Sequence, residues 1–156
     1  MIHIVNEFPS ERAVVGAVPL ANELRPVLLR LARELRRELA PLGLTAGQAA
    51  LLHAIRTTRG VGIRELAARE GVSAPRVSAA VDRLQTRGLV ERTRSGSDRR
   101  RVELTLTEEG ERVLRSARRR RTAWLAARLA RLDARERGAV AEALGPLTRL
   151  LEAEAE

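Results

Sequence analysis

Cysteine, tyrosine and lysine are all missing from this chain of 156 residues, and aromatic residues make up only 1% of it. Without cysteine there can be no disulfide framework, no thiol redox switch and no cysteine ligand for zinc. The two histidines, His3 and His53, are too few and too far apart in the sequence to suggest a metal centre. The chain also lacks a glycine-rich phosphate loop and a Ser-His-Asp set that can be placed. We therefore expect no cofactor, no metal and no enzymatic activity.

No hydrophobic run approaches the roughly 18 apolar residues that cross a bilayer. The N-terminal stretch MIHIVNEFPSERAVVGAVPLA carries acidic residues near its start and only a short apolar run, unlike a signal peptide. We therefore expect a cytoplasmic protein without a membrane partner. Apolar residues still make up 44% of the chain, and its length suits a single domain over residues 1–156. With so few aromatic residues, the core must be built from Leu, Val, Ile and Ala, which favours packed helices.

The positive charge is concentrated in the middle of the chain. Arginine accounts for all 29 Lys and Arg positions, and the formal net charge is +9. Residues 56–101 contain 12 arginines and five acidic residues, a net charge of +7, whereas residues 1–55 and 102–156 each have a net charge of +1. A concentrated basic block predicts binding to a polyanion, and a solubilising surface is the alternative.

Apolar periodicity and turn residues predict six helices and one hairpin. Apolar residues recur at helical spacing from Leu20 to Leu39, where Pro26 marks either the start of the helix or a kink. Further helices are expected at about 46–57, 63–71, 74–86, 108–132 and from 134 onward. Their expected N-cap residues are Thr45, Ser73, Thr107 and Asp133. The segments LVERTR and RVELTLT alternate in period two around SGSD, which predicts a two-stranded hairpin.

The helix at 74–86 has the setting of a DNA-reading helix. A short turn, GVS, joins it to the preceding short helix, as in a helix-turn-helix whose second helix enters the major groove. The hairpin that follows would make this a winged helix. Projection at about 100° per residue places Val77, Val81 and Leu84 on the inward side. The opposite side carries Pro75, Ala79, Asp82 and Thr86, with Arg76, Arg83 and Arg87 along one flank and Ser78 and Gln85 along the other.

This outward face is small in its middle and arginine-lined at one edge. Small residues let a helix approach base edges closely, and arginine pairs with guanine or holds phosphate. We expect Asp82 to orient a neighbouring arginine. The residues expected to contact DNA from this helix and its cap are Ser73, Ala74, Pro75, Arg76, Ser78, Ala79, Arg83 and Arg87.

Three stretches together carry a family resemblance. LTAGQAALLHAI, GIRELAAREGVSAPRVSAAVDRLQTRGLVERT and SDRRRVELTLTEEG resemble the MarR family of bacterial transcriptional regulators, closely over about residues 44–110. The resemblance implies a mainly α fold of six helices with a small β-hairpin wing. It places the winged helix-turn-helix at 45–106 and dimerisation helices at 17–42 and 107–153. It also implies a homodimer that reads a palindromic site, with half-sites about one helical turn apart.

The resemblance also assigns the hairpin tip. In the family the arginine of an Asp-x-Arg pattern enters the minor groove, which here is Arg100 held by Asp98. A narrow A·T-rich minor groove attracts an inserted arginine, and a nearby carboxylate can fix its aim. The alternative is a solvated tip with an incidental ion pair. The residues expected to contact DNA from the wing are Arg94, Ser97, Asp98, Arg99, Arg100 and Arg101.

Two arginines, Arg121 and Arg128, fall on the apolar side of the helix at 108–132. A half-buried arginine needs an acidic partner or an anionic ligand. One interpretation is a structural ion pair with Glu34 or Glu38. The other, which the family resemblance implies, is a pocket for a small anionic or aromatic effector. Its candidate residues are His53, Arg121, Trp124 and Arg128, although His53 could be purely structural and Trp124 could belong to a dimer core.

We therefore expect a sequence-specific regulator of transcription that binds double-stranded DNA and associates with the nucleoid when bound. In the form implied by the resemblance it is a homodimeric, ligand-responsive repressor acting on a palindromic operator. One alternative is an architectural DNA-binding protein of low specificity. The other is a winged helix used only as a protein-interaction module.

Overall fold

The computed structural model describes residues 11–58, 60–94 and 102–152, and the chain divides after Arg37 into two compact units. In its described residues the first unit is one helix, α1 (Glu11–Arg37), which contains both Pro19 and Pro26. This helix begins earlier than the sequence predicted. Each proline removes one backbone hydrogen bond, and the helical pattern of the residues around it is enough to keep the helix continuous. Large apolar side chains are exposed along it, namely Val14, Val15, Val18, Leu20, Val27, Leu28, Leu29 and Leu31.

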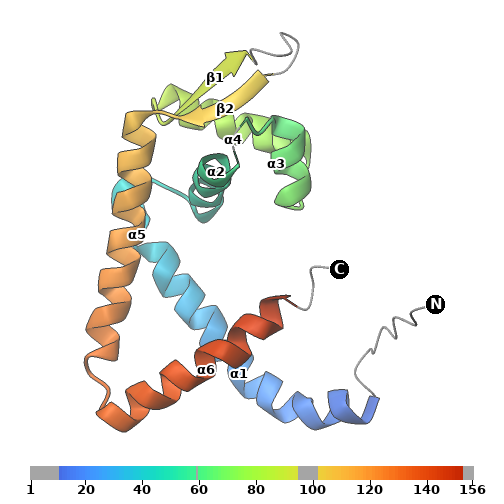
Figure 1. Cartoon of the computed structure of the whole chain (residues 1–156), viewed down its shortest axis with the longest axis vertical. Helices are drawn as coiled ribbons and strands as arrows, with labels where there is room; N and C mark the ends of the chain where they lie inside the picture. The colour runs from blue at the N-terminus through green and yellow to red at the C-terminus, as the bar shows by residue number, and fades with distance from the viewer. Residues whose placement is uncertain (1–10, 59, 95–101, 153–156) are drawn as a thin grey trace, which may run out of the picture. The chain divides into compact units, whose positions relative to one another are not determined.

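The second unit has the winged-helix order that the sequence predicted (Figure 1). The short 3-10 helix η1 (Ala40–Leu42) leads into α2 (Ala46–Thr57), α3 (Ile63–Arg69) and α4 (Ala74–Thr86). The strands β1 (Val90–Arg94) and β2 (Val102–Leu106) follow, and then α5 (Glu108–Leu129) and α6 (Ala134–Glu152). The two strands are antiparallel, with Val90 opposite Leu106 and Arg94 opposite Val102. The predicted fold class, mainly α with a small hairpin, is confirmed.

Side-chain caps explain several of the helix boundaries. Thr45 and Gln48 form a reciprocal capping box at the start of α2. Thr107 accepts from the Gly110 amide at the start of α5. Asp133 and Glu136 bond to each other's backbone amides at the start of α6. Ser73 occupies the cap position of α4 but makes no capping hydrogen bond with its side chain, which differs from the prediction.

The hydrophobic core is centred on α2, which lies between α5 on one side and the α3–α4 pair on the other (Figure 1). Its fully buried leucines come from almost every surrounding segment, and they are Leu39, Leu52, Leu66, Leu84, Leu89 and Leu104. The amide of Leu104 donates to the carbonyl of Val61 at 3.0 Å, so the segment between α2 and α3 is hydrogen-bonded to β2. This hydrogen bond attaches the hairpin to the helical core.

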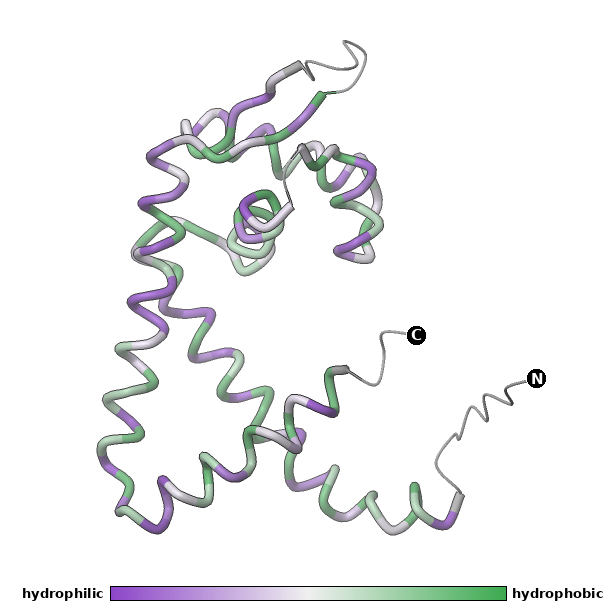
Figure 2. The backbone as a smooth tube through the Cα atoms, viewed as in Figure 1, coloured by the Kyte–Doolittle hydropathy of each residue, from purple (hydrophilic) through white to green (hydrophobic). Residues whose placement is uncertain are grey.

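The helix α5 changes character along its length. Leu114 and Ala117 in its N-terminal half are buried against the core, whereas Leu125 further along is 39% exposed. Along α6, hydrophobic residues recur between hydrophilic ones (Figure 2), and Val140, Leu144 and Leu151 are exposed. In the described part of the chain, no helix has the length and hydropathy needed to cross a bilayer.

Candidate nucleic-acid interface

The turn between α3 and α4 is short and tightly hydrogen-bonded. Gly71 adopts the left-handed conformation, with φ at 62°, which an L side chain rarely tolerates. The amide of Gly71 donates to Ala68 at 3.3 Å, and that of Val72 donates to Ala67 at 3.0 Å. Pro75 then lies in the first turn of α4, where its missing N–H removes no helical hydrogen bond. This is the geometry of a helix-turn-helix, with α4 as its second helix.

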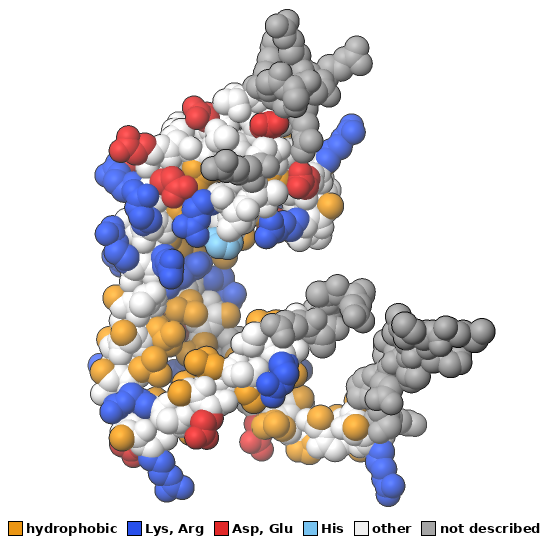
Figure 3. All heavy atoms as spheres, viewed as in Figure 1, with side chains coloured by type: hydrophobic (Ala, Val, Ile, Leu, Met, Phe, Trp, Pro, Cys, Tyr) orange, Lys and Arg blue, Asp and Glu red, His pale blue; other side chains and the backbone are white. Residues whose placement is uncertain are grey.

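The two sides of α4 differ as the helical projection predicted. Val77, Val81 and Leu84 are buried in the core. The opposite side is exposed, with Pro75, Ala79, Asp82 and Thr86. Along the flanks, Arg76, Arg83 and Arg87 are exposed, and Ser78 and Gln85 are half-buried. A narrow outward strip of small residues beside arginines is therefore available to a ligand outside the core. Arginines (blue) gather over the winged helix and the adjacent half of α5 in Figure 3.

Two of the flanking arginines line a pocket. Arg76 and Arg83 face a cavity of about 510 Å³, and its other wall is the first turn of α2 with its capping box. Two guanidinium groups and a helix N-terminus therefore border the cavity, and Glu70 is the one acidic residue among the described residues of its lining. The sequence placed these arginines on a common flank but gave no sign that α2 would lie beside them.

Asp82 forms an ion pair with Arg92 of β1, with 2.6 Å between Oδ1 and Nη2. The expectation that Asp82 orients a neighbouring arginine is thus confirmed. Arg92 was not among the residues singled out from the sequence. The period-two alternation held the signal, because Val90 and Arg92 share one face of the strand and Val90 is buried. The ion pair links the exposed side of α4 to the hairpin.

Arg87 has a different environment from the other two flanking arginines. Its Nη1 donates to the carbonyl of Gly43 at 2.7 Å, and its Nη2 donates to the carbonyl of Leu42 at 2.8 Å. The side chain is exposed, yet its guanidinium is bonded to the backbone that leads into α2.

The hairpin tip lies outside the described residues. Of the predicted wing residues, Arg94 ends β1. Ser97, Asp98, Arg99, Arg100 and Arg101 all fall in the segment 95–101, so their predicted roles stay predictions.

The four candidate effector residues fall in two places. His53 and Arg121 line a cavity of about 280 Å³ between α2 and α5, together with Arg56 and Arg118. Trp124 and Arg128 are not in its lining. The guanidinium of Arg128 lies 3.6 Å from the centre of the Trp124 ring and donates to the Trp124 carbonyl at 3.1 Å.

Glu34 and Glu38, the two glutamates that the sequence suggested as partners of Arg121, each form an ion pair with another arginine. Glu38 pairs with Arg120, the preceding residue of α5, at 3.3 Å. Glu34 pairs with Arg37 at 2.7 Å within α1.

Comparisons with known proteins agree with this geometry. A family model described as MarR family matches residues 42–101. An uncharacterized HTH-type transcriptional regulator from Mycobacterium bovis is 32% identical over 118 residues, which cover 76% of this chain and 82% of the relative. The HTH-type transcriptional repressor MdtR of Bacillus subtilis is 28% identical over 88 residues, 56% of this chain and 57% of the relative. The solved structure of a mutant MarR from E. coli has a TM-score of 0.72 and 28% identity, covering 85% of this chain and 96% of the solved one.

Proposed function

Because this chain belongs to the MarR family of HTH-type transcriptional regulators, and so is a DNA-binding regulator rather than an enzyme, we propose that it acts as a homodimeric, ligand-responsive repressor. The proposed target is a palindromic operator on the chromosome, and the proposed location of the protein is the cytoplasm. The repressor role is supported by the name of MdtR, to which part of the chain is similar. The dimer is supported by the exposed apolar side chains of α1 and α6.

The observation that carries the proposal is the exposed side of α4. It combines small residues, Pro75 and Ala79, with the arginines Arg76 and Arg83 on one flank. In the proposed complex this side enters the major groove, where arginine donates two hydrogen bonds to guanine or one to phosphate. The cap residues Ser73 and Ala74 and the half-buried Ser78 complete the proposed contact surface.

The proposed role of the wing rests on the sequence. Arg100 would insert into an A·T-rich minor groove, and Asp98 would aim it. We expect Arg100→Ala to weaken binding to the operator by about 1–3 kcal/mol, the scale of one good groove contact. Arg99→Ala is the matched control, because the family resemblance assigns the minor-groove insertion to Arg100 and not to Arg99, so this variant should lose less. Titration of both variants at matched salt tests this, and wild-type affinity for Arg100→Ala would contradict it.

Two measurements separate this proposal from its alternatives. A sequence-specific regulator should bind the site footprinted in its own promoter region about 10³-fold or more tightly than random DNA. An architectural protein would show a ratio near one. A protein-interaction module would show no salt-dependent DNA binding at all, because it would neutralise no phosphates.

The effector proposal rests on the cavity between α2 and α5. His53, Arg56, Arg118 and Arg121 converge there beside the apolar Leu114 and Ala117. A small anionic aromatic molecule matches this mixture of positive charge and apolar wall. We expect salicylate to weaken operator binding and Arg121→Ala to remove that response.

Arg128→Ala is the control for the effector proposal, because Arg128 stacks on Trp124 outside the cavity lining, and it should keep the response to salicylate. The proposal is wrong if operator affinity is unchanged at millimolar concentrations of several anionic aromatic compounds.

A further inference from the structure

The segment Glu38–Gly43, here called the connector, is the start of the second unit and leads into α2. Leu39 within it is fully buried in the core, and η1 occupies most of the rest. Its amides bond within the turn, with the Leu42 amide donating to the Leu39 carbonyl at 3.0 Å and the Gly43 amide to the Ala40 carbonyl at 2.9 Å. The carbonyls of Leu42 and Gly43 at its far end are left for acceptance from elsewhere.

Two arginines from distant parts of the chain hold the two ends of the connector. At its start, Arg120 of α5 donates from Nε to the Glu38 carbonyl at 3.2 Å and from Nη2 to the Glu38 carboxylate at 3.3 Å. At its end, Arg87 donates from its two terminal nitrogens to the Gly43 carbonyl at 2.7 Å and the Leu42 carbonyl at 2.8 Å. Arg87 is the residue that terminates α4.

The shape of the guanidinium group explains why arginine occupies both positions. A planar fork with fixed N–H directions can donate to two acceptors at once, whereas a lysine ammonium is a point charge without this geometry. The acceptors of Arg87 also lie at the C-terminal end of η1, where the last carbonyls of a helix have no partner within it. Arg87 is therefore bonded to the protein in a way that a phosphate-contacting arginine need not be.

We propose that Arg87 and Arg120 are positioning residues that use the connector to fix the C-terminal end of α4 relative to α5. The inference rests on the proposed function, because a dimer that reads two half-sites needs its two recognition helices at one set separation. A small change in the angle between α4 and α5 changes that separation and misplaces every base contact together. Arg87 thus serves operator recognition through the connector, and not as a DNA contact.

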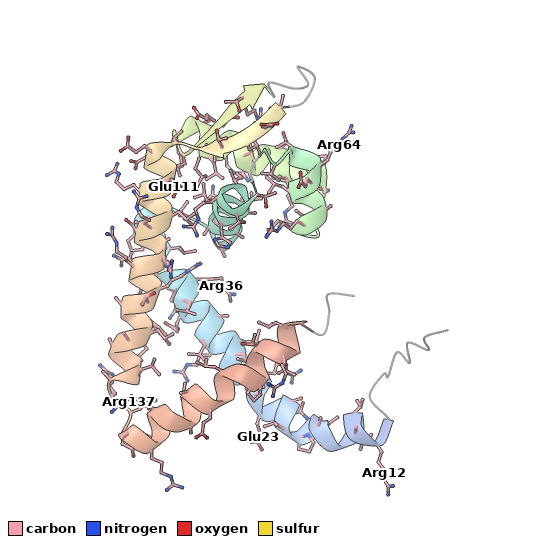
Figure 4. The ribbon with its side chains drawn as sticks, viewed as in Figure 1. Arg12, Glu23, Arg36, Arg64, Glu111 and Arg137 are labelled. Atoms are coloured by element: carbon pink, nitrogen blue, oxygen red, sulfur yellow. The ribbon has the colours of Figure 1, made fainter. Side chains whose placement is uncertain are left out.

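Arginine-to-lysine variants test the proposal, because they keep the charge and lose the fork. A phosphate contact tolerates lysine, but a two-acceptor brace does not. We expect Arg87→Lys and Arg120→Lys each to weaken binding to the footprinted promoter site by about fivefold to thirtyfold. Affinity for a random-sequence duplex of equal length and the salt dependence of binding should stay at wild-type values. The matched control is Arg64→Lys, because Arg64 projects outward from α3 (Figure 4). This variant should bind both duplexes as the wild-type protein does.

The double variant tests whether both arginines act through one segment. Once one end of the connector is released, holding the other end has less effect, so the loss for Arg87→Lys/Arg120→Lys should be smaller than the product of the single losses. Wild-type affinity in Arg87→Lys overturns the proposal, and so does a double loss equal to that product.

Hydrogen exchange gives a readout that needs no DNA. The Leu42 and Gly43 amides should exchange faster in Arg87→Lys, while amides in α6 stay at the wild-type rate. Unchanged exchange in the connector would overturn the brace itself. If wild-type protein shows no preference for any promoter site, the proposed function fails, and the exchange rates still decide whether the brace exists.

Discussion

At the scale of single residues, Gly110 shows how closely α5 approaches the segment between α4 and β1. A Cβ atom placed on Gly110 would lie 2.0 Å from the carbonyl oxygen of Leu89, which is far inside van der Waals contact. Thr107 fixes the same junction, because its hydroxyl donates to the Gly88 carbonyl at 2.6 Å and accepts from the Gly110 amide at 3.0 Å. The start of α5 is therefore packed backbone against backbone on the segment between α4 and β1.

Gly110→Ala should destabilise the fold by about 1–3 kcal/mol, because either α5 or the backbone at Leu89 must shift. Helix propensity alone predicts the opposite sign, since alanine is better than glycine in a helix by up to about 1 kcal/mol. The matched control is Gly47→Ala, in the first turn of α2, where a Cβ would meet nothing within 4 Å. Denaturant unfolding of both variants should show a loss for Gly110→Ala and none for Gly47→Ala. Equal changes would contradict the close approach.

At the scale of elements, local signals predicted the helices and strands of the winged helix well. The bounds of α2 and α4 match the expectation, because Thr45 provides a side-chain cap and glycines such as Gly88 stop the helices. The start of α1 was missed, because Pro26 resembles a boundary in sequence although the helix continues through it. Pattern could predict where each element begins far better than what each one touches.

The candidate site shows the same division between local and tertiary information. The outward face of α4 follows from helical periodicity, so it could be predicted. The bonds from Arg87 to Leu42 and Gly43 cross 45 and 44 residues of sequence, and no local pattern marks them. The partner of Asp82 also depended on how the hairpin packs against α4. Exposure and charge alone would not show that Arg87 and Arg92 are bonded within the protein.

The ion pair between Asp82 and Arg92 leads to a prediction about specificity. Removing an acidic residue from a DNA-facing side should favour binding if only net charge matters. We expect Asp82→Ala instead to weaken operator binding by about 1–2 kcal/mol, because Arg92 and the hairpin lose their tie to α4. Affinity for random DNA should stay constant or rise, so the specificity ratio falls.

Glu91→Ala is the matched control for Asp82→Ala. Glu91 lies on the same strand as Arg92, but its carboxylate accepts a hydrogen bond from the Thr105 hydroxyl of β2 and not from α4. Its removal should change operator and random-DNA affinity by the same factor. Tighter operator binding by Asp82→Ala in the same titrations would show that the ion pair does not position the hairpin.

At the scale of the whole molecule, burial is unevenly distributed. Among the described residues, the buried hydrophobic side chains all lie between Leu39 and Ala117. Outside that range many of the large apolar side chains of α1 and α6, and Leu125 near the end of α5, are exposed, with Leu144 at 60% and Leu151 at 80%. Monomeric proteins rarely leave so many apolar residues uncovered along helices. A second copy of the chain, as in the proposed homodimer, is the partner expected to cover them.

Leu144→Glu should therefore weaken the dimer by about 2–3 kcal/mol or more, because it replaces an apolar side chain with a charge at a surface that becomes buried on association. Sedimentation velocity across a concentration series measures this as a shift toward monomer. Operator affinity should fall with it, since a monomer contacts one half-site only. The winged helix should keep its stability, because Leu144 lies outside its core.

Arg149→Glu controls for charge in this experiment. Arg149 lies on the opposite side of α6 from Val140, Leu144 and Leu151 by helical projection, and the substitution changes the net charge by more than Leu144→Glu does. Dissociation of the dimer by Leu144→Glu but not by Arg149→Glu would locate the interface on the apolar side of α6. If Leu144→Glu sediments as wild type does at every concentration, this side of α6 is not part of a dimer interface, and another surface must cover the exposed apolar residues.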